Sequence, residues 1–103
     1  MRDKICMFLG LARKANVLVL GEEGVEKAIC RKKTRLVVLA SDASDNTKKG
    51  IVNMCERFRV SYRVFGMKEV IGEYLGKGNV AVIGVKNKGF AKRLVEMIDD
   101  IKK

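Results

Sequence analysis

Two continuously apolar stretches place the strongest constraint on how this chain can fold. Residues 36–40 read LVVLA and residues 80–85 read VAVIGV, with no polar side chain in either stretch. Runs of this length, rich in β-branched residues, are typical of strands that are covered on both faces by helices. We therefore expect both runs at the centre of a sheet.

The segments around these runs alternate between helical and extended patterns. Apolar residues recur at helical spacing in most of them, while 17–20 and 61–65 have the composition of strands. The expected helices cover residues 3–15, 22–32, 45–58, 68–75 and 89–101. The connections are too short for a second domain, so we expect residues 1–103 to form one α/β domain. The predicted architecture is a three-layer α/β/α sandwich around a mixed sheet of about four strands.

The composition argues against a membrane protein. Hydrophobic residues make up 48% of the chain, which suits a packed core. No apolar run approaches the roughly 18 residues that a membrane span needs. The opening MRDKICMFLGLARKA has apolar residues at helical spacing and lacks the apolar core of a signal peptide. The expected location is the cytoplasm, with no membrane partner.

The cysteines and the missing histidine limit the chemistry. Cys6, Cys30 and Cys55 are widely spaced among apolar helical neighbours, which predicts buried or half-buried thiols rather than a redox or zinc motif. The chain has no histidine, so nucleophilic triads that use one are excluded. We expect no metal, no cofactor and no enzymatic activity.

The charge favours a polyanionic partner. The chain carries 22 Lys and Arg against 12 Asp and Glu, a net charge of +10. Nucleic acid is the favoured partner for so basic a small domain. A membrane surface and a basic surface that serves solubility alone are the alternatives.

A glycine-rich segment, GKGN at 76–79, resembles part of a phosphate loop. A nucleotide-binding P-loop follows a strand and opens a helix. Here the expected order is the reverse, helix and then strand. A nucleotide site is therefore disfavoured, although Lys77 and Gly78 could still lie against the backbone of a ligand.

The start of the helix expected at residue 22 carries the most informative polar groups. Gly21 marks the turn from strand to helix, where backbone N–H groups are free to bind a ligand. The carboxylates of Glu22 and Glu23 can accept hydrogen bonds from base edges. The alternative is that both glutamates only stabilise the start of the helix.

Cations follow along the same helix. Lys27 and Arg31 are four residues apart and share one face, and Gly24 on that face would allow close approach of a ligand. Arg13 and Lys14, at the end of the preceding helix, are expected to flank the same edge. These cations suit phosphates, so the helix combines groups for bases with groups for backbone.

Three segments carry a family resemblance: LGLARKANVLVLGEEGVEKAI, LVVLASDASDNTKK and GFAKRLVEMI. Together they resemble the kink-turn RNA-binding family of ribosomal proteins, the L-seven-Ae and L-thirty-e group, and in particular its bacterial YlxQ-type members. The resemblance covers nearly the whole chain. It implies an α/β/α sandwich that binds kinked RNA with tandem sheared G·A pairs.

The family's recognition motif reads glycine, any residue, asparagine, glutamate, two residues and lysine. Gly21 and Lys27 match it, whereas Glu23 replaces the asparagine and Gly24 replaces the glutamate. The loop at 77–79 also lacks the apolar residues with which the family covers a flipped nucleotide. We therefore expect weaker binding of a standard kink-turn than is typical. Restoring asparagine and glutamate should tighten binding and stabilise the helix.

The sequence thus leads to one favoured function and one alternative. The favoured function is that of a non-catalytic RNA-binding protein, ribosome-associated, with ribosomal proteins as further partners. The alternative is a protein–protein adaptor on a ribosomal or RNA-processing complex. A single basic edge would favour RNA, and evenly scattered cations would favour the adaptor. The predicted RNA-binding residues are Arg13, Lys14, Gly21, Glu22, Glu23, Lys27, Arg31, Lys77 and Gly78.

Overall fold

The two apolar runs form the central strands of a four-stranded mixed sheet in the computed structural model, which describes residues 2–101. The strands are β1 (Leu18–Leu20), β2 (Leu36–Leu39), β3 (Ser61–Val64) and β4 (Val82–Val85), in the order β1-β4-β2-β3. β4 is antiparallel to both its neighbours, and β3 is parallel to β2. All residues of β2 and β4 are buried, as the sequence predicts.

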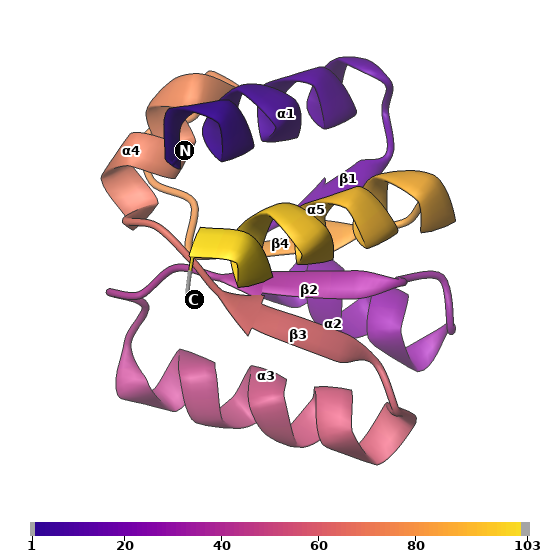
Figure 1. Ribbon diagram of the computed structural model, residues 1–103. Helices are drawn as coiled ribbons and strands as arrows, with labels where there is room; N and C mark the ends of the chain where they lie inside the picture. Colours follow the sequence, from indigo (N-terminus) through magenta and orange to yellow (C-terminus); the bar gives the residue numbers. More distant parts are fainter. Residues whose placement is uncertain (1, 102–103) are drawn as a thin grey trace.

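The helices pack on both faces of the sheet and complete three layers (Figure 1). They are α1 (Arg2–Lys14), α2 (Glu22–Cys30), α3 (Asp45–Phe58), α4 (Lys68–Leu75) and α5 (Lys88–Ile101). α1, α4 and α5 share one hydrophobic cluster with the sheet, and α2 and α3 share another. The predicted α/β/α sandwich is confirmed. Within the described residues, no helix is both long and apolar enough to span a membrane.

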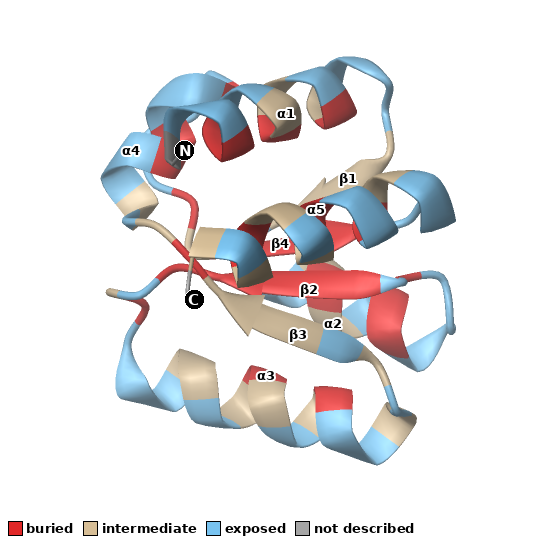
Figure 2. Ribbon diagram, viewed as in Figure 1, coloured by how far each residue is buried: buried red, intermediate tan, exposed pale blue. Residues whose placement is uncertain are grey.

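Alternation along β2 divides the core between the two faces. Leu36 and Val38 contact the cluster under α1, α4 and α5, whereas Val37 and Leu39 contact the cluster under α2 and α3. Successive side chains of a strand point to opposite faces, so one apolar run serves both layers. Figure 2 shows the consequence, with burial concentrated in the central strands and the inner faces of the helices.

The two ends of the strands carry different functional groups, so each end is named by the feature found there. β1 ends just before Gly21, whose N–H donates to the carbonyl of Val82 (2.9 Å), and we call this end of the sheet the groove end. β1 begins beyond Val17, whose carbonyl accepts from the N–H of Lys86 (2.8 Å), and we call this the basic end. α2 runs from the groove end to the basic end, because it follows β1 and leads back into β2.

The structure corrects two details of the sequence analysis. The helix predicted over 22–32 ends at Cys30, because Lys32 adopts a left-handed conformation with φ of 58° and its N–H bonds to the carbonyl of Ile29. The prediction of buried or half-buried cysteines holds for Cys6 and Cys55 and is wrong for Cys30, which is exposed. As the last residue of α2, Cys30 lies outside the buried stripe of that helix.

Candidate nucleic-acid interface

The start of α2 is a helix terminus without a side-chain cap. Gly21 occupies the cap position with φ of 95° and ψ of 154°, a conformation open almost only to glycine. Its carbonyl accepts from the N–H of Val25 (3.0 Å) and begins the helix. The N–H groups of the first turn have no capping side chain, so they remain free to donate to a ligand.

A groove of about 440 Å³ lies beside this helix start. Three segments that are distant in the sequence line it, namely the β1–α2 junction, the first turn of α3 and the loop between α4 and β4. Its polar lining includes Gly21, Glu22, Thr47, Lys77, Gly78 and Asn79. Four residues that the sequence analysis selected, Gly21, Glu22, Lys77 and Gly78, therefore lie around one cavity.

Glu22 is held at the groove by a short chain of hydroxyl groups. The hydroxyl of Ser44 donates to Thr47 Oγ1 (2.9 Å), and the hydroxyl of Thr47 donates to Glu22 Oε1 (3.0 Å). Ser44 also caps α3 by accepting from the N–H of Thr47 (3.2 Å). These bonds leave further acceptor positions on the carboxylate, which can take hydrogen bonds from a ligand.

The loop on the opposite wall is tightly held against α4. The N–H of Lys77 donates to the carbonyl of Gly72 (2.7 Å), and the N–H of Val80 donates to the carbonyl of Lys68 (3.0 Å). Gly72 allows this approach, because a Cβ there would lie 2.5 Å from the carbonyl oxygen of Gly78. The loop therefore presents Lys77 and Gly78 in a defined place.

Glu23 and Lys27 lie outside the groove. Their charged groups form a helical ion pair with 3.4 Å between Lys27 Nζ and Glu23 Oε1. Both side chains are largely exposed, so the pair contributes at most about 1 kcal/mol to stability. Lys27 remains available to a phosphate that passes along α2.

Gly24 does not provide an open approach for a ligand, which corrects the sequence-based expectation. A Cβ at this position would lie 2.9 Å from Cγ1 of Val19 in β1. The missing side chain therefore allows close packing of α2 against the edge strand. No open space for a ligand lies beside residue 24.

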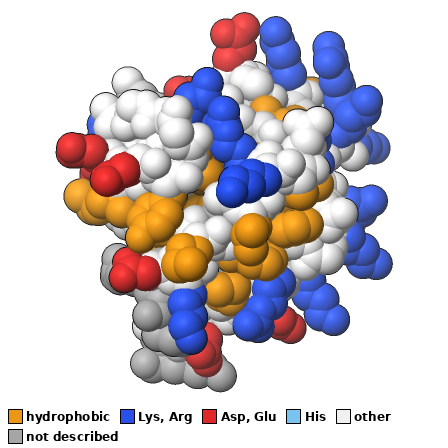
Figure 3. Space-filling model, turned by 90° about the horizontal axis from the view of Figure 1, so that it is seen from above, with side chains coloured by type: hydrophobic (Ala, Val, Ile, Leu, Met, Phe, Trp, Pro, Cys, Tyr) orange, Lys and Arg blue, Asp and Glu red, His pale blue; other side chains and the backbone are white. Residues whose placement is uncertain are grey.

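The expectation that Arg13 and Lys14 flank the groove is wrong. They end α1 just before β1 begins, so they lie at the basic end, whereas Gly21 lies at the opposite end of the strands. Arg31, at the far end of α2, lies at the basic end too. Figure 3 shows Lys and Arg gathered along the right-hand edge, and Figure 1 places the basic end on that side. The cations therefore neither line a single edge around the groove nor lie evenly over the surface, which were the two arrangements expected for RNA binding and for an adaptor.

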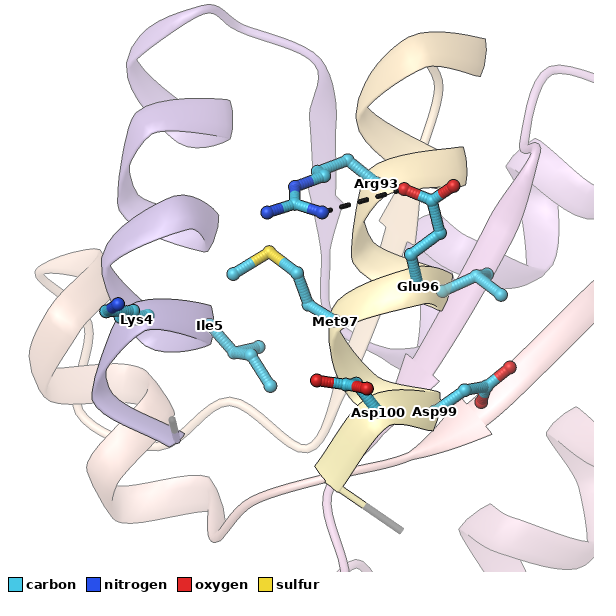
Figure 4. Close-up of a pocket in the computed structure, with 8 residues that line it drawn as sticks. Lys4, Ile5, Arg93, Glu96, Met97, Asp99 and Asp100 are labelled. Carbon is cyan, nitrogen blue, oxygen red and sulfur yellow. Dashed lines mark ion pairs between the residues drawn. The ribbon is translucent and has the colours of Figure 1, made fainter. Parts of the chain in front are cut away.

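A larger hollow, of about 630 Å³, lies between α1 and α5 (Figure 4). Its rim carries the carboxylates of Glu96, Asp99 and Asp100. Arg93 pairs with Glu96 (3.6 Å), and Asp99 accepts two hydrogen bonds from Arg63 (2.7 and 3.1 Å). These carboxylates disfavour phosphate, so this hollow is a weaker candidate for nucleic acid than the groove.

Sequence reasoning missed Thr47 and Asn79 at the groove. Thr47 is the third residue after the α3 cap, and a Ser-x-x-Thr pattern at a helix start points only to local capping. Its contact with Glu22 joins residues 25 positions apart, and no local pattern could show that. Asn79 follows Lys77 and Gly78 directly, so the same GKGN segment could have included it.

With the geometry in place, comparison with known proteins gives the family. The sequence profile of the ribosomal protein L7Ae/L30e/S12e/Gadd45 family matches residues 3–95. The chain belongs to this family. Two bacterial relatives are named RNA-binding protein YlxQ. The Bacillus subtilis (strain 168) protein is 37% identical over 88% of this chain and 91% of its own length. The Enterococcus faecium protein is 34% identical over 95% of this chain and 94% of its own.

Two solved structures share the fold of this chain. A protein of unknown function from Bacillus halodurans C has a TM-score of 0.90 and 40% identity, covering 93% of this chain and 97% of that one. The Giardia lamblia 15.5kD RNA binding protein has a TM-score of 0.77 and 18% identity, covering 93% of this chain and 85% of that one. At that identity the second likeness concerns the fold alone.

Proposed function

We propose that this member of the L7Ae/L30e/S12e/Gadd45 family is a non-catalytic, ribosome-associated RNA-binding protein of the cytoplasm that recognises kinked or non-canonically paired RNA. RNA binding is supported by the family and by the names of the two bacterial relatives. The observation that carries the proposed mode is the groove in which a carboxylate, free helix N–H groups and a lysine meet.

Each group at the groove suits a different part of a kinked RNA. Where two strands diverge, a guanine exposes an edge with N–H donors, and Glu22 offers acceptor atoms to them. The free N–H groups at the start of α2 and the ammonium of Lys77 suit phosphate oxygens. A straight duplex exposes phosphates but keeps its base edges in grooves, so Glu22 would contribute nothing to its binding.

Neutralising Glu22 tests this mode. Glu22→Gln removes acceptor capacity and places an amide N–H₂ group towards the guanine donors. Binding of a kinked RNA with tandem sheared G·A pairs should weaken by about tenfold, in line with about 1–3 kcal/mol for a good base contact. Binding of a straight duplex should stay unchanged or become slightly tighter, because a negative charge is removed. Filter binding or fluorescence anisotropy at one fixed salt concentration measures both.

Glu23→Gln is the matched control. It makes the same change of charge one residue further on, but Glu23 lies outside the groove and faces solvent. Its affinity for kinked RNA should not fall. If Glu22→Gln binds kinked RNA as tightly as the unchanged protein, the groove does not read bases and this mode of recognition is wrong.

An adaptor function is the second candidate, because one face of the molecule exposes apolar side chains. Met7 and Leu11 on α1 and Val70 and Tyr74 on α4 are all exposed, and Figure 3 looks onto this face with its hydrophobic patches. α1 and α4 pack against each other. Met7→Ser with Leu11→Ser would abolish co-sedimentation with ribosomes, at unchanged affinity for isolated RNA, if the chain is an adaptor. Unchanged co-sedimentation would exclude this use of the face.

A further inference from the structure

The turns at the basic end differ in charge from those at the groove end. Three turns lie at the basic end, and with the helix residues next to them they cover 13–17, 31–35 and 86–88; each carries cations and no Asp or Glu. At the groove end, residues 40–45 include two aspartates, and residues 76–81 carry a single cation, Lys77. The net positive charge of the protein is therefore concentrated on one side, opposite the proposed base-reading groove.

The exposed cations of the basic end are available to a partner, whereas Arg13 is half-buried. The ion pairs found among the described residues join Lys27 to Glu23, Arg63 to Asp99 and Arg93 to Glu96. None involves the three basic turns. Lys14, Lys33 and Lys86 are exposed. Their mutual repulsion is unfavourable unless an anion relieves it.

Stabilisation of helix ends does not account for this distribution. α1 and α2 end at the basic end, and cations near a helix C-terminus are favourable there. α5, however, begins at the same end with Lys88 and has no acidic residue in its first turn. A cation at a helix N-terminus is unfavourable for the helix alone. The cations around Lys88 are therefore better explained by a ligand.

The basic end also contains a defined hollow. A cavity of about 270 Å³ lies between the start of β2 and the end of α3, and its lining combines Lys32, Thr34, Arg35, Arg59 and Ser61 with the apolar Ile29, Phe58 and Val60. Backbone bonds hold its rim, since the N–H of Arg35 donates to the carbonyl of Val85 (2.8 Å). Three cations around a small cavity with a hydroxyl group suit a phosphate.

We propose that the basic end is a second RNA-binding surface, which contacts the phosphodiester backbone without reading sequence. One protein molecule then holds two RNA segments, one at the groove and one at the basic end. α2 separates the two surfaces by about 13 Å, from the usual rise of about 1.5 Å per helical residue. The binding of two RNA segments at once rests on the proposed function of the groove. The inference that the basic end binds RNA rests only on the charges at that end.

A capture experiment tests the second surface. Immobilised kinked RNA is saturated with the protein, and a fluorescent straight RNA duplex is then added. The protein should capture the duplex. Lys33→Gln with Lys86→Gln should reduce capture by at least tenfold and lower the slope of log affinity against log salt by about 1.5, at roughly 0.7–0.9 per lost contact. Lys4→Gln with Lys49→Gln, which removes the same charge elsewhere, should leave capture nearly unchanged.

Three outcomes would overturn the proposal. They are no capture of the duplex, an equal loss of capture in the control pair, and capture of polyglutamate as efficient as that of RNA. Failure of the groove function is separable, because binding of the straight duplex to free protein does not need the groove. Such binding would still depend on Lys33 and Lys86 if only the groove function were wrong.

Discussion

Gly72→Ala should displace the loop that forms one wall of the groove. A Cβ at residue 72 would lie 2.5 Å from the carbonyl oxygen of Gly78 and 3.0 Å from that of Lys77. Carbon and oxygen atoms in contact lie about 3.3 Å apart or more, so the helix or the loop must move by roughly 0.8 Å. Both obstructing atoms belong to the backbone and cannot rotate away as a side chain can.

The expected energy follows from two opposing effects. Inserting a methyl group into a tightly packed site costs about 1–3 kcal/mol. Replacing glycine by alanine inside a helix returns about 1 kcal/mol. Gly72→Ala should therefore lower the free energy of unfolding by about 1 kcal/mol. Since the displaced loop carries Lys77, losing one contact of about 1.4 kcal/mol would weaken binding of kinked RNA about tenfold.

Gly50→Ala provides the matched control. Gly50 lies inside α3, and an added Cβ there meets nothing within 4 Å. The same gain in helix propensity should appear without the steric cost, so this variant should be slightly more stable and bind RNA unchanged. Urea unfolding gives both free energies, and the difference between the variants isolates the clash. If Gly72→Ala is as stable as Gly50→Ala, the loop does not rest on α4 as described.

Two further predictions concern buried groups. Thr34→Val should stabilise the fold by about 1 kcal/mol in urea unfolding, because Thr34 Oγ1 is buried without a hydrogen-bond partner among the described residues, whereas Thr47→Val should not stabilise it. Burial, with a smaller contribution from Glu56, raises the pKa of the Cys55 thiol from 9.0 to about 11. As the pH rises, the Cys55 thiol therefore ionises in the unfolded chain before it ionises in the folded one. Its contribution to the free energy of unfolding, on the order of 2 kcal/mol, is present below pH 9 and should be lost between pH 9 and 11. Cys55→Ala should abolish that loss, and a Cys55→Ala profile that matches the unchanged protein would contradict the assignment.

Local sequence patterns were sufficient for the layers of the fold. The runs at 36–40 and 80–85 placed β2 and β4 at the centre, because a strand without polar side chains must be covered on both faces. The boundary of α4 was also predicted correctly, since Gly76 follows its last apolar residue and adopts the left-handed conformation that ends helices. These features depend on neighbouring residues alone.

The site depends on contacts that local patterns do not contain. Arg13 and Lys14, at the end of the preceding helix, were expected to flank the same edge as Gly21. Strand β1 lies between them and runs from one end of the sheet to the other, so Arg13 and Lys14 lie at the opposite end from Gly21. Conversely, Glu22 and Lys77 come together from distant segments because α2 and the loop before β4 meet at one end of the sheet. Sequence distance is misleading wherever a strand intervenes.

Gly24 shows how the same limit affects a mutational prediction. By sequence, Gly24→Glu restores a base-reading residue and stabilises a helix. In the structure a Cβ at residue 24 would lie 2.9 Å from Cγ1 of Val19, a β-branched side chain with little rotational freedom. The steric cost of about 1–3 kcal/mol equals or exceeds the helix gain of about 1 kcal/mol. Gly24→Ala alone should therefore be neutral to destabilising.

Val19→Ala removes the obstructing methyl group, so Gly24→Ala should stabilise the protein by about 1 kcal/mol in that background. The two substitutions should then show a favourable coupling of about 1–3 kcal/mol in a double-mutant cycle. Equal effects of Gly24→Ala in both backgrounds would show that Val19 does not require glycine at residue 24. With coupling present, Gly24→Glu can be assessed as a base-reading change only in the Val19→Ala chain, where the added side chain does not also displace α2.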